Sequence, residues 1–153
     1  VPLAECCQKA LDSIRQSVPE GVALTFNPAP EQVIIKTDVM RLQQLFTNLL
    51  DNAIKFTEKG EINLAYSLEA DRKQVRITVT DTGTGIPPEI QEEIFKRFKK
   101  QDDSRAGTGL GLPICYYIAE HLSGPGKIFL DTSYTAGARF VFIHPCETDV
   151  PVI

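Results

Sequence analysis

The chain has 153 residues, of which 42 % are hydrophobic and 24 % are charged; this balance is typical of one globular domain and excludes a disordered segment. Its net charge of −4 argues against nucleic acid as the main partner, because a phosphate backbone attracts a net basic face. The sequence contains no run of about 18 apolar residues, so it predicts no membrane-spanning segment.

Hydrophobic periodicity and turn signals divide the chain into helices and short strands. Apolar residues recur at three- and four-residue spacing in the helices and alternate in the strands. Asp38 is the expected N-cap of the longest helix, and Gly60 is expected to end it. In chain order, we predict a helix over residues 2–17, strands over 22–26 and 32–36, a helix from 38 to about 57, strands over 62–68 and 75–79, a loop over 81–85, a short helix over 87–98, a polar loop over 99–109, a helix over 112–122, and strands over 127–131 and 138–144.

Helices and strand pairs are interspersed in this order, without repeated strand–helix–strand units. The order predicts an α+β fold, a two-layer sandwich in which helices cover one face of a single sheet. We assign residues 1–146 to one domain and residues 147–153, which show no periodicity, to a C-terminal tail or linker. The chain begins at Val1 rather than at a methionine, and we interpret this start as a boundary excised from a longer protein.

The longest predicted helix carries polar side chains beside its apolar stripe. Asn48, Asn52 and Lys55 fall within a strip roughly 60° wide when residues are placed at 100° steps. Amide oxygens are hard ligands that Mg²⁺ accepts, and a lysine one turn later can bind a phosphate as a point charge. A solvated polar flank without function explains the same strip, so this helix alone leaves both interpretations open.

Two glycine-bearing segments also suit a ligand. In the first, Asp81 could accept a hydrogen bond from an amino group such as that of adenine, while Gly83 and Gly85 would let the ligand approach the backbone. An ordinary turn is the alternative. The second, residues 107–112, opens a helix whose free N–H groups suit a phosphate. Its spacing differs from a P-loop, and no strand precedes it as in a dinucleotide-binding fold.

Together these segments resemble the motifs of the histidine-kinase catalytic domain, in order and over almost the whole chain. The resemblance implies the Bergerat fold of the GHKL superfamily, with a mixed, mostly antiparallel sheet of about five strands and three main helices on one face. Residues 48–56 resemble the N box, 81–86 the G1 box, 94–98 the F box, 107–112 the G2 box, and 137–140 the closing glycine–phenylalanine element.

The resemblance also implies the roles of individual residues. Asn52 would bind Mg²⁺, and Asp81 would bind the adenine amino group. The catalytic residues would be Asn52, Lys55 facing the phosphates, and Arg105, a candidate γ-phosphate contact in an ATP lid over residues 99–106. The implied ATP-binding residues are Asn48, Asn52, Lys55, Phe56, Asp81, Gly83, Gly85, Ile86, Phe98, Gly107, Thr108, Gly109, Leu110, Gly111 and Leu112.

The ATPases of the same superfamily are the main alternative. Gyrase, Hsp90 and MutL carry a water-activating glutamate four residues before the metal-binding asparagine, where this chain has Asn48. An amide is not a base at neutral pH, so Asn48 favours phosphoryl transfer over hydrolysis. A GHKL-type ATPase, a serine kinase and a degenerate nucleotide-sensing module stay open as alternatives.

The phosphoryl acceptor is expected outside this chain. Neither His121 nor His144 is followed by the acidic residue that accompanies a phosphoacceptor histidine. The resemblance therefore implies three partners: ATP, a histidine-bearing dimerisation domain of the same parent protein, and a response regulator or receiver domain. It further implies a monomeric, cytoplasmic fragment whose parent is anchored in the inner membrane of a bacterium.

Overall fold

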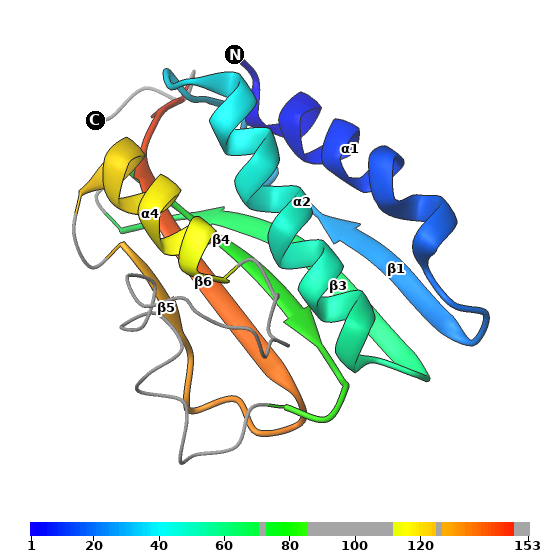
Figure 1. Ribbon diagram of the computed structural model, residues 1–153. Helices are drawn as coiled ribbons and strands as arrows, with labels where there is room; N and C mark the ends of the chain where they lie inside the picture. The colour runs from blue at the N-terminus through cyan, green and yellow to red at the C-terminus, as the bar shows by residue number, and fades with distance from the viewer. Residues whose placement is uncertain (71–72, 86–111, 125–126, 149–153) are drawn as a thin grey trace.

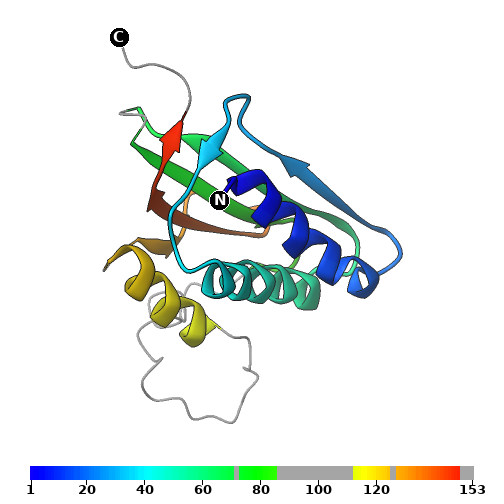
Figure 2. The same ribbon diagram turned by 90° about the horizontal axis from the view of Figure 1, so that it is seen from above.

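The computed structural model describes residues 1–70, 73–85, 112–124 and 127–148. Its elements form two layers, a five-stranded sheet and a layer of three helices on one face of that sheet (Figures 1 and 2). In chain order they are α1 (Leu3–Ile14), the 3₁₀ helix η1 (Arg15–Ser17), β1 (Val22–Asn27), β2 (Val33–Ile34), α2 (Val39–Phe56), β3 (Gly60–Leu68), β4 (Gln74–Asp81), α4 (Leu112–Ser123), β5 (Ile128–Leu130), β6 (Ala138–Pro145) and β7 (Glu147–Thr148). The predicted α+β sandwich is confirmed. The helix predicted over residues 87–98 and the loop over 99–109 lie outside the described residues.

The main sheet is mixed, with the strand order β1-β3-β4-β6-β5. β1 and β3 run parallel, joined through α2, and every other neighbouring pair is antiparallel. The mixed, mostly antiparallel sheet implied by the resemblance is therefore confirmed. A second small sheet pairs β2 with β7, so the first two residues of the predicted tail pair with the domain. The division at residue 146 itself stays a prediction.

The core lies between the sheet and the helices. The apolar stripe of α2 faces the sheet, and the inward residues of β3 and β4 meet it because side chains alternate along a strand. Asp38 caps this helix as predicted, since its Oδ1 accepts a hydrogen bond from the Arg41 backbone N–H at 3.2 Å. The buried hydrophobic residues of the three elements are Leu42, Leu45, Phe46, Leu49, Leu50, Ala53, Ile62, Leu64, Tyr66, Val75, Ile77 and Val79. This packing fixes the direction in which the polar residues of α2 point.

Gly60 does not end the long helix, so that part of the prediction is wrong. α2 ends at Phe56 with Thr57 as its C-cap, and Gly60 is the first residue of β3. Glycine is needed there for another reason. The backbone has φ +122°, and a Cβ atom would collide with the Thr82 hydroxyl. That hydroxyl accepts a hydrogen bond from the Glu61 backbone N–H at 3.0 Å, so the start of β3 and the end of β4 meet closely.

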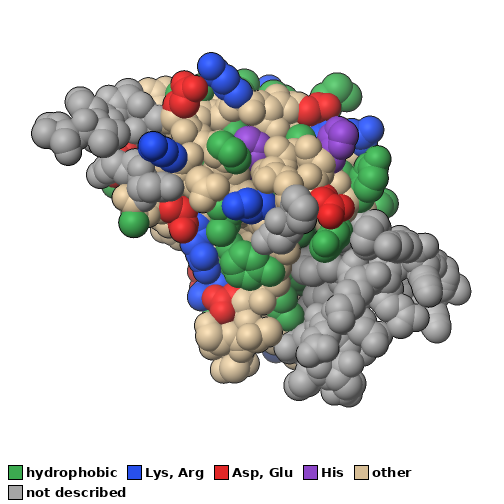
Figure 3. Space-filling view, turned by 90° about the vertical axis from the view of Figure 1, so that its left-hand side faces the viewer, with side chains coloured by type: hydrophobic (Ala, Val, Ile, Leu, Met, Phe, Trp, Pro, Cys, Tyr) green, Lys and Arg blue, Asp and Glu red, His purple; other side chains and the backbone are tan. Residues whose placement is uncertain are grey.

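The side of the molecule formed by β5 and α4 carries charges of both signs. Figure 3 shows acidic and basic side chains interspersed there with hydrophobic ones, without a continuous basic stripe among the residues drawn in colour. In the described part of the chain, no helix is long and apolar enough to cross a membrane.

Candidate active site

The last turns of α2 bring a polar side chain into the core. Asn52 is 2 % exposed, and its Oδ1 has no hydrogen-bond partner in the described part of the chain. Asn48, one turn earlier, is half-buried, and Lys55 is exposed. A buried polar atom without a partner costs about 1–3 kcal/mol, so such an atom in a folded protein calls for an explanation, and a bound ligand is one.

The loop after β4 packs directly against this end of α2. The Thr84 backbone N–H donates to the Phe56 carbonyl at 3.1 Å, which satisfies one of the carbonyls that a helix leaves unpaired at its end. A Cβ atom on Gly83 would collide with the same carbonyl, and Gly85 has φ +76°. Both positions therefore need glycine, one for close approach and one for its backbone conformation.

Asp81 is the buried carboxylate of this corner. It is 3 % exposed, and its Oδ1 accepts hydrogen bonds from the backbone N–H groups of Gly83 at 2.9 Å and Ala138 at 3.2 Å. Burial raises the pKa of Asp81 above its ordinary range, and the two backbone donors oppose that shift. Because an ionised carboxylate only accepts, this side chain suits a donor group on a ligand.

Two residues of this corner, Tyr134 and Thr57, were not found by sequence reasoning. The Tyr134 hydroxyl donates to the Asp81 carbonyl at 2.9 Å, and the Thr57 hydroxyl is buried without a partner in the described part of the chain. The glycine–phenylalanine element at 137–140 marked the strand that supports Asp81. Nothing in the spacing marked Tyr134, because its partner lies 53 positions away.

The structure thus places one group of the predicted site residues on the second half of α2, at the end of β4 and on the loop that packs against the end of α2: Asn48, Asn52, Lys55, Phe56, Asp81, Gly83 and Gly85. Another group lies outside the described residues: Ile86, Phe98, Arg105, Gly107, Thr108, Gly109, Leu110 and Gly111. Leu112 is the first residue of α4.

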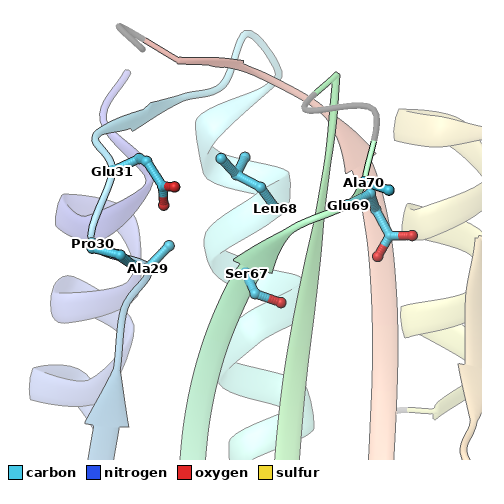
Figure 4. Close-up of a pocket in the computed structure, with 7 residues that line it drawn as sticks. All are labelled: Ala29, Pro30, Glu31, Ser67, Leu68, Glu69 and Ala70. Carbon is cyan, nitrogen blue, oxygen red and sulfur yellow. The ribbon is translucent and has the colours of Figure 1, made fainter.

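A separate hollow of about 370 Å³ lies at the opposite end of β3. Figure 4 shows its lining, which comes from the chain after β1 and from the end of β3. Its lining residues are Ala29, Pro30, Glu31, Ser67, Leu68, Glu69 and Ala70. It contains no predicted site residue, and its two carboxylates disfavour a ligand that carries phosphates. The charge of this hollow therefore does not suit a nucleotide.

Known proteins resemble the chain along most of its length. A protein family described as "Histidine kinase-, DNA gyrase B-, and HSP90-like ATPase" matches residues 37–148. The sensor protein SrrB of Staphylococcus aureus is 37 % identical over 149 residues, which cover 94 % of this chain and 25 % of SrrB. The chain therefore spans about a quarter of the length of the curated relatives it matches.

Solved structures of histidine kinases share the fold. The nucleotide-free catalytic domain of histidine kinase ThkA has a TM-score of 0.73 and 29 % identity, covering 94 % of this chain and 93 % of that one. ThkA in complex with the response regulator protein TrrA has a TM-score of 0.71 and 28 % identity, covering 95 % of this chain and 40 % of that one. The chain therefore belongs to the histidine kinase-, DNA gyrase B- and HSP90-like ATPase family, and within that family it is similar to the catalytic domain of a histidine kinase.

Proposed function

We propose that this domain binds ATP together with Mg²⁺ in the corner between α2 and the loop after β4, and that the γ-phosphoryl group passes to a histidine on a separate dimerisation domain of the same parent protein. The observation that carries the proposal is the Asn52 amide oxygen, which is buried without a partner in the described part of the chain. It lies one turn before the helix end against which the Asp81 loop packs.

The donor set fits Mg²⁺. The Asn52 Oδ1 is a hard oxygen ligand, and Mg²⁺ commonly takes only one or two ligands from the protein while keeping waters and substrate phosphates. Among the described residues, no group of three or more histidine, cysteine, aspartate or glutamate side chains could hold a metal on its own. When bound, Mg²⁺ would neutralise the negative charge that develops on the phosphates. We assign this ligand role to Asn52.

The remaining residues would position the two ends of ATP. Lys55 and Arg105 would meet the phosphates, together with the backbone N–H groups of residues 107–111 ahead of α4. At the other end, Asp81 would accept a hydrogen bond from the adenine amino group, with Phe56 and Phe98 beside the base or ribose. Phosphoryl transfer needs little covalent chemistry from the protein, so positioning and charge stabilisation carry the rate.

The acceptor histidine would come from outside the chain. His144 is 3 % exposed, so an incoming phosphoryl group could not reach its ring. His121 is exposed and its ring stacks on Tyr117, 6.3 Å between centroids. Since ThkA is a structural relative solved with the response regulator TrrA, we propose a response regulator as the next acceptor. A cytoplasmic, monomeric domain within a membrane-anchored bacterial parent completes the proposal.

The test is transfer of a labelled γ-phosphoryl group to the separately purified histidine-bearing domain of the parent. The variant Asn52→Ala removes the amide oxygen, and we expect it to lower transfer about a hundredfold. It should also abolish the gain in ATP affinity that Mg²⁺ gives over EDTA. Gln44→Ala is the matched control, because Gln44 is a half-buried amide on the same helix whose Oε1 accepts from Arg41.

Two outcomes would overturn the proposal. If Asn52→Ala kept both transfer and the Mg²⁺ effect, Asn52 would have no metal role. If the isolated domain hydrolysed ATP rapidly in steady state, the ATPase alternative would be favoured over histidine phosphorylation. Slow hydrolysis is expected from the wild type, because the amide of Asn48 cannot activate water.

A further inference from the structure

The turn between β5 and β6, residues 131–137, reaches across the sheet to Asp81. Its Tyr134 is half-buried, and its hydroxyl donates to the Asp81 backbone carbonyl at 2.9 Å. Asp81 is the last residue of β4, so this hydroxyl holds the peptide group at the point where the strand becomes the ligand-binding loop. Neither the fold nor the strand pairing requires that contact.

Arg139 holds Tyr134 in place. Its guanidinium carbon lies 4.4 Å from the centre of the Tyr134 ring, within the range of a cation–π contact. The same side chain donates from Nε to the Thr80 hydroxyl at 3.1 Å and pairs with the Asp131 carboxylate at 3.6 Å. Arg139 thus joins the ring to β4 and to the start of the turn, which restricts the rotamers of Tyr134.

The same turn also holds the Asp81 side chain. The Ala138 N–H donates to its Oδ1 at 3.2 Å. Gly137 packs so closely that a Cβ atom there would collide with the Asp81 carbonyl and lie 2.9 Å from its Oδ1. The Asp81 backbone is therefore held by Tyr134 of this turn, and its carboxylate is held by Ala138, the first residue of β6, together with Gly83.

We infer that Tyr134 is a positioning residue for the base-reading carboxylate, and that it contributes to the preference of this site for a purine with an exocyclic amino group. The inference rests on the proposed role of Asp81. A hydrogen bond to an amino group depends on the angle at which the carboxylate is presented, and that angle follows the Asp81 peptide that Tyr134 holds. A buried, preorganised acceptor avoids the ordering cost on binding.

The test compares two nucleotides on the purified domain. ADP has the 6-amino group, and purine riboside diphosphate lacks it. Tyr134→Phe removes the hydroxyl but keeps the ring over which Arg139 stacks. We expect it to weaken ADP binding about three- to tenfold, the range of one hydrogen bond, and to leave the affinity for purine riboside diphosphate unchanged, as measured by calorimetry. A general loosening of the fold would weaken both ligands equally.

Two further variants separate the possible failures. Asp81→Asn should reduce the preference for ADP over purine riboside diphosphate whether or not Tyr134 has a role. If this preference is unchanged, Asp81 does not read the base, and the proposed function fails at that point. If Asp81→Asn acts as expected while Tyr134→Phe changes both affinities equally or neither, only the inference about Tyr134 is overturned. Tyr66→Phe is the control, because Tyr66 lies further along β3, opposite Ile77 rather than Asp81.

Discussion

The two halves of the candidate site differ in how their buried polar atoms are paired. Around Asp81, the carboxylate and the backbone carbonyl both have partners, in Gly83, Ala138 and Tyr134. At the end of α2, the Asn52 Oδ1 and the Thr57 hydroxyl are buried without a partner in the described part of the chain. Among the described residues, the half that would read the base has its buried polar atoms paired before a ligand binds, whereas the half that would hold the metal has two that are not paired.

This difference has an energetic meaning. A paired buried carboxylate contributes to the fold as well as to binding, because its removal leaves backbone donors unsatisfied. An unpaired buried oxygen lowers the stability of the ligand-free fold and gains a partner only when a ligand arrives. Stability and binding should therefore respond differently to substitutions in the two halves.

The strongest test replaces Asp81 and Asn52 by alanine in two separate variants and compares their stability. Asp81→Ala leaves the N–H groups of Gly83 and Ala138 without their acceptor, and we expect the free energy of unfolding to fall by about 1–3 kcal/mol. Asn52→Ala removes an oxygen that has no partner among the described residues and introduces a better helix former, so the free energy of unfolding of this variant should stay within about 0.5 kcal/mol of the wild type. Urea unfolding measures both. Equal losses in the two variants would contradict the contrast.

A subtler substitution separates binding from folding within the paired half. Asp81→Asn keeps an oxygen that can accept from both backbone donors but replaces the ionised acceptor that would face adenine. We expect ADP affinity to fall at least about tenfold, because a hydrogen bond to a charged group is worth about 1.5–3 kcal/mol. The free energy of unfolding at pH 7 should not fall. Calorimetric titration and urea unfolding of the same preparation check both points.

The pH dependence of stability, compared between the wild type and Asp81→Asn, shows whether burial or hydrogen bonding dominates at the Asp81 carboxylate. Burial raises the pKa of Asp81 above its ordinary value of 3.8, so the folded state holds the proton more tightly than the unfolded state. The wild type, measured relative to Asp81→Asn, should therefore be most stable below the ordinary value and lose stability as pH rises through the raised pKa. At pH values above the raised pKa, the difference in free energy of unfolding between the wild type and Asp81→Asn should be constant. A wild type that gained relative stability with rising pH would indicate that hydrogen bonds, rather than burial, dominate.

The smallest expected effect concerns the unpaired half. Thr57→Val replaces a buried hydroxyl, 1 % exposed and without a partner among the described residues, by a methyl group of similar size. We expect the free energy of unfolding to rise by up to about 1 kcal/mol. The ATP affinity of Thr57→Val decides the role of the hydroxyl. Unchanged affinity would mean that the hydroxyl does not contact the ligand, and weaker affinity would mean that it does. A loss of stability would show that the hydroxyl is paired in solution.

Local patterns predicted the elements, and the long-range contacts were harder to foresee. The Asp38 cap and the apolar stripe of α2 depend on neighbours within a few positions, so spacing alone was sufficient. Gly60 was misassigned because its conformation serves a contact with Thr82, 22 positions away in the sequence. The parallel pairing of β1 with β3 likewise depends on which strands the tertiary fold brings together.

The candidate site shows the same division. The helical wheel placed Asn48, Asn52 and Lys55 on one flank of a helix, and the burial of Asn52 agrees with a position at the core edge. That these residues share one site with Asp81 was predicted only from the resemblance to a family, because no periodicity in the sequence relates α2 to the end of β4. Tyr134 carried no signal, since a tyrosine in a turn is unremarkable until its hydroxyl is located.

The position of α2 has a mechanical consequence. Its capped start follows β2 by a few residues, and the chain just before it is held by the Val1 amino group, which donates to the Ile35 carbonyl at 2.9 Å; in Figure 1 the start of α2 lies at the end of the molecule where the N-terminus is marked. Asn52 lies about 21 Å further along the same helix, at about 1.5 Å per residue. A tilt of about 3° at the start would move Asn52 by about 1 Å, a displacement that can change the rate of a positioned reaction about a hundredfold. If the proposed phosphate site is correct, α2 would act as a lever whose fixed end is the capped start and whose other end carries Asn52.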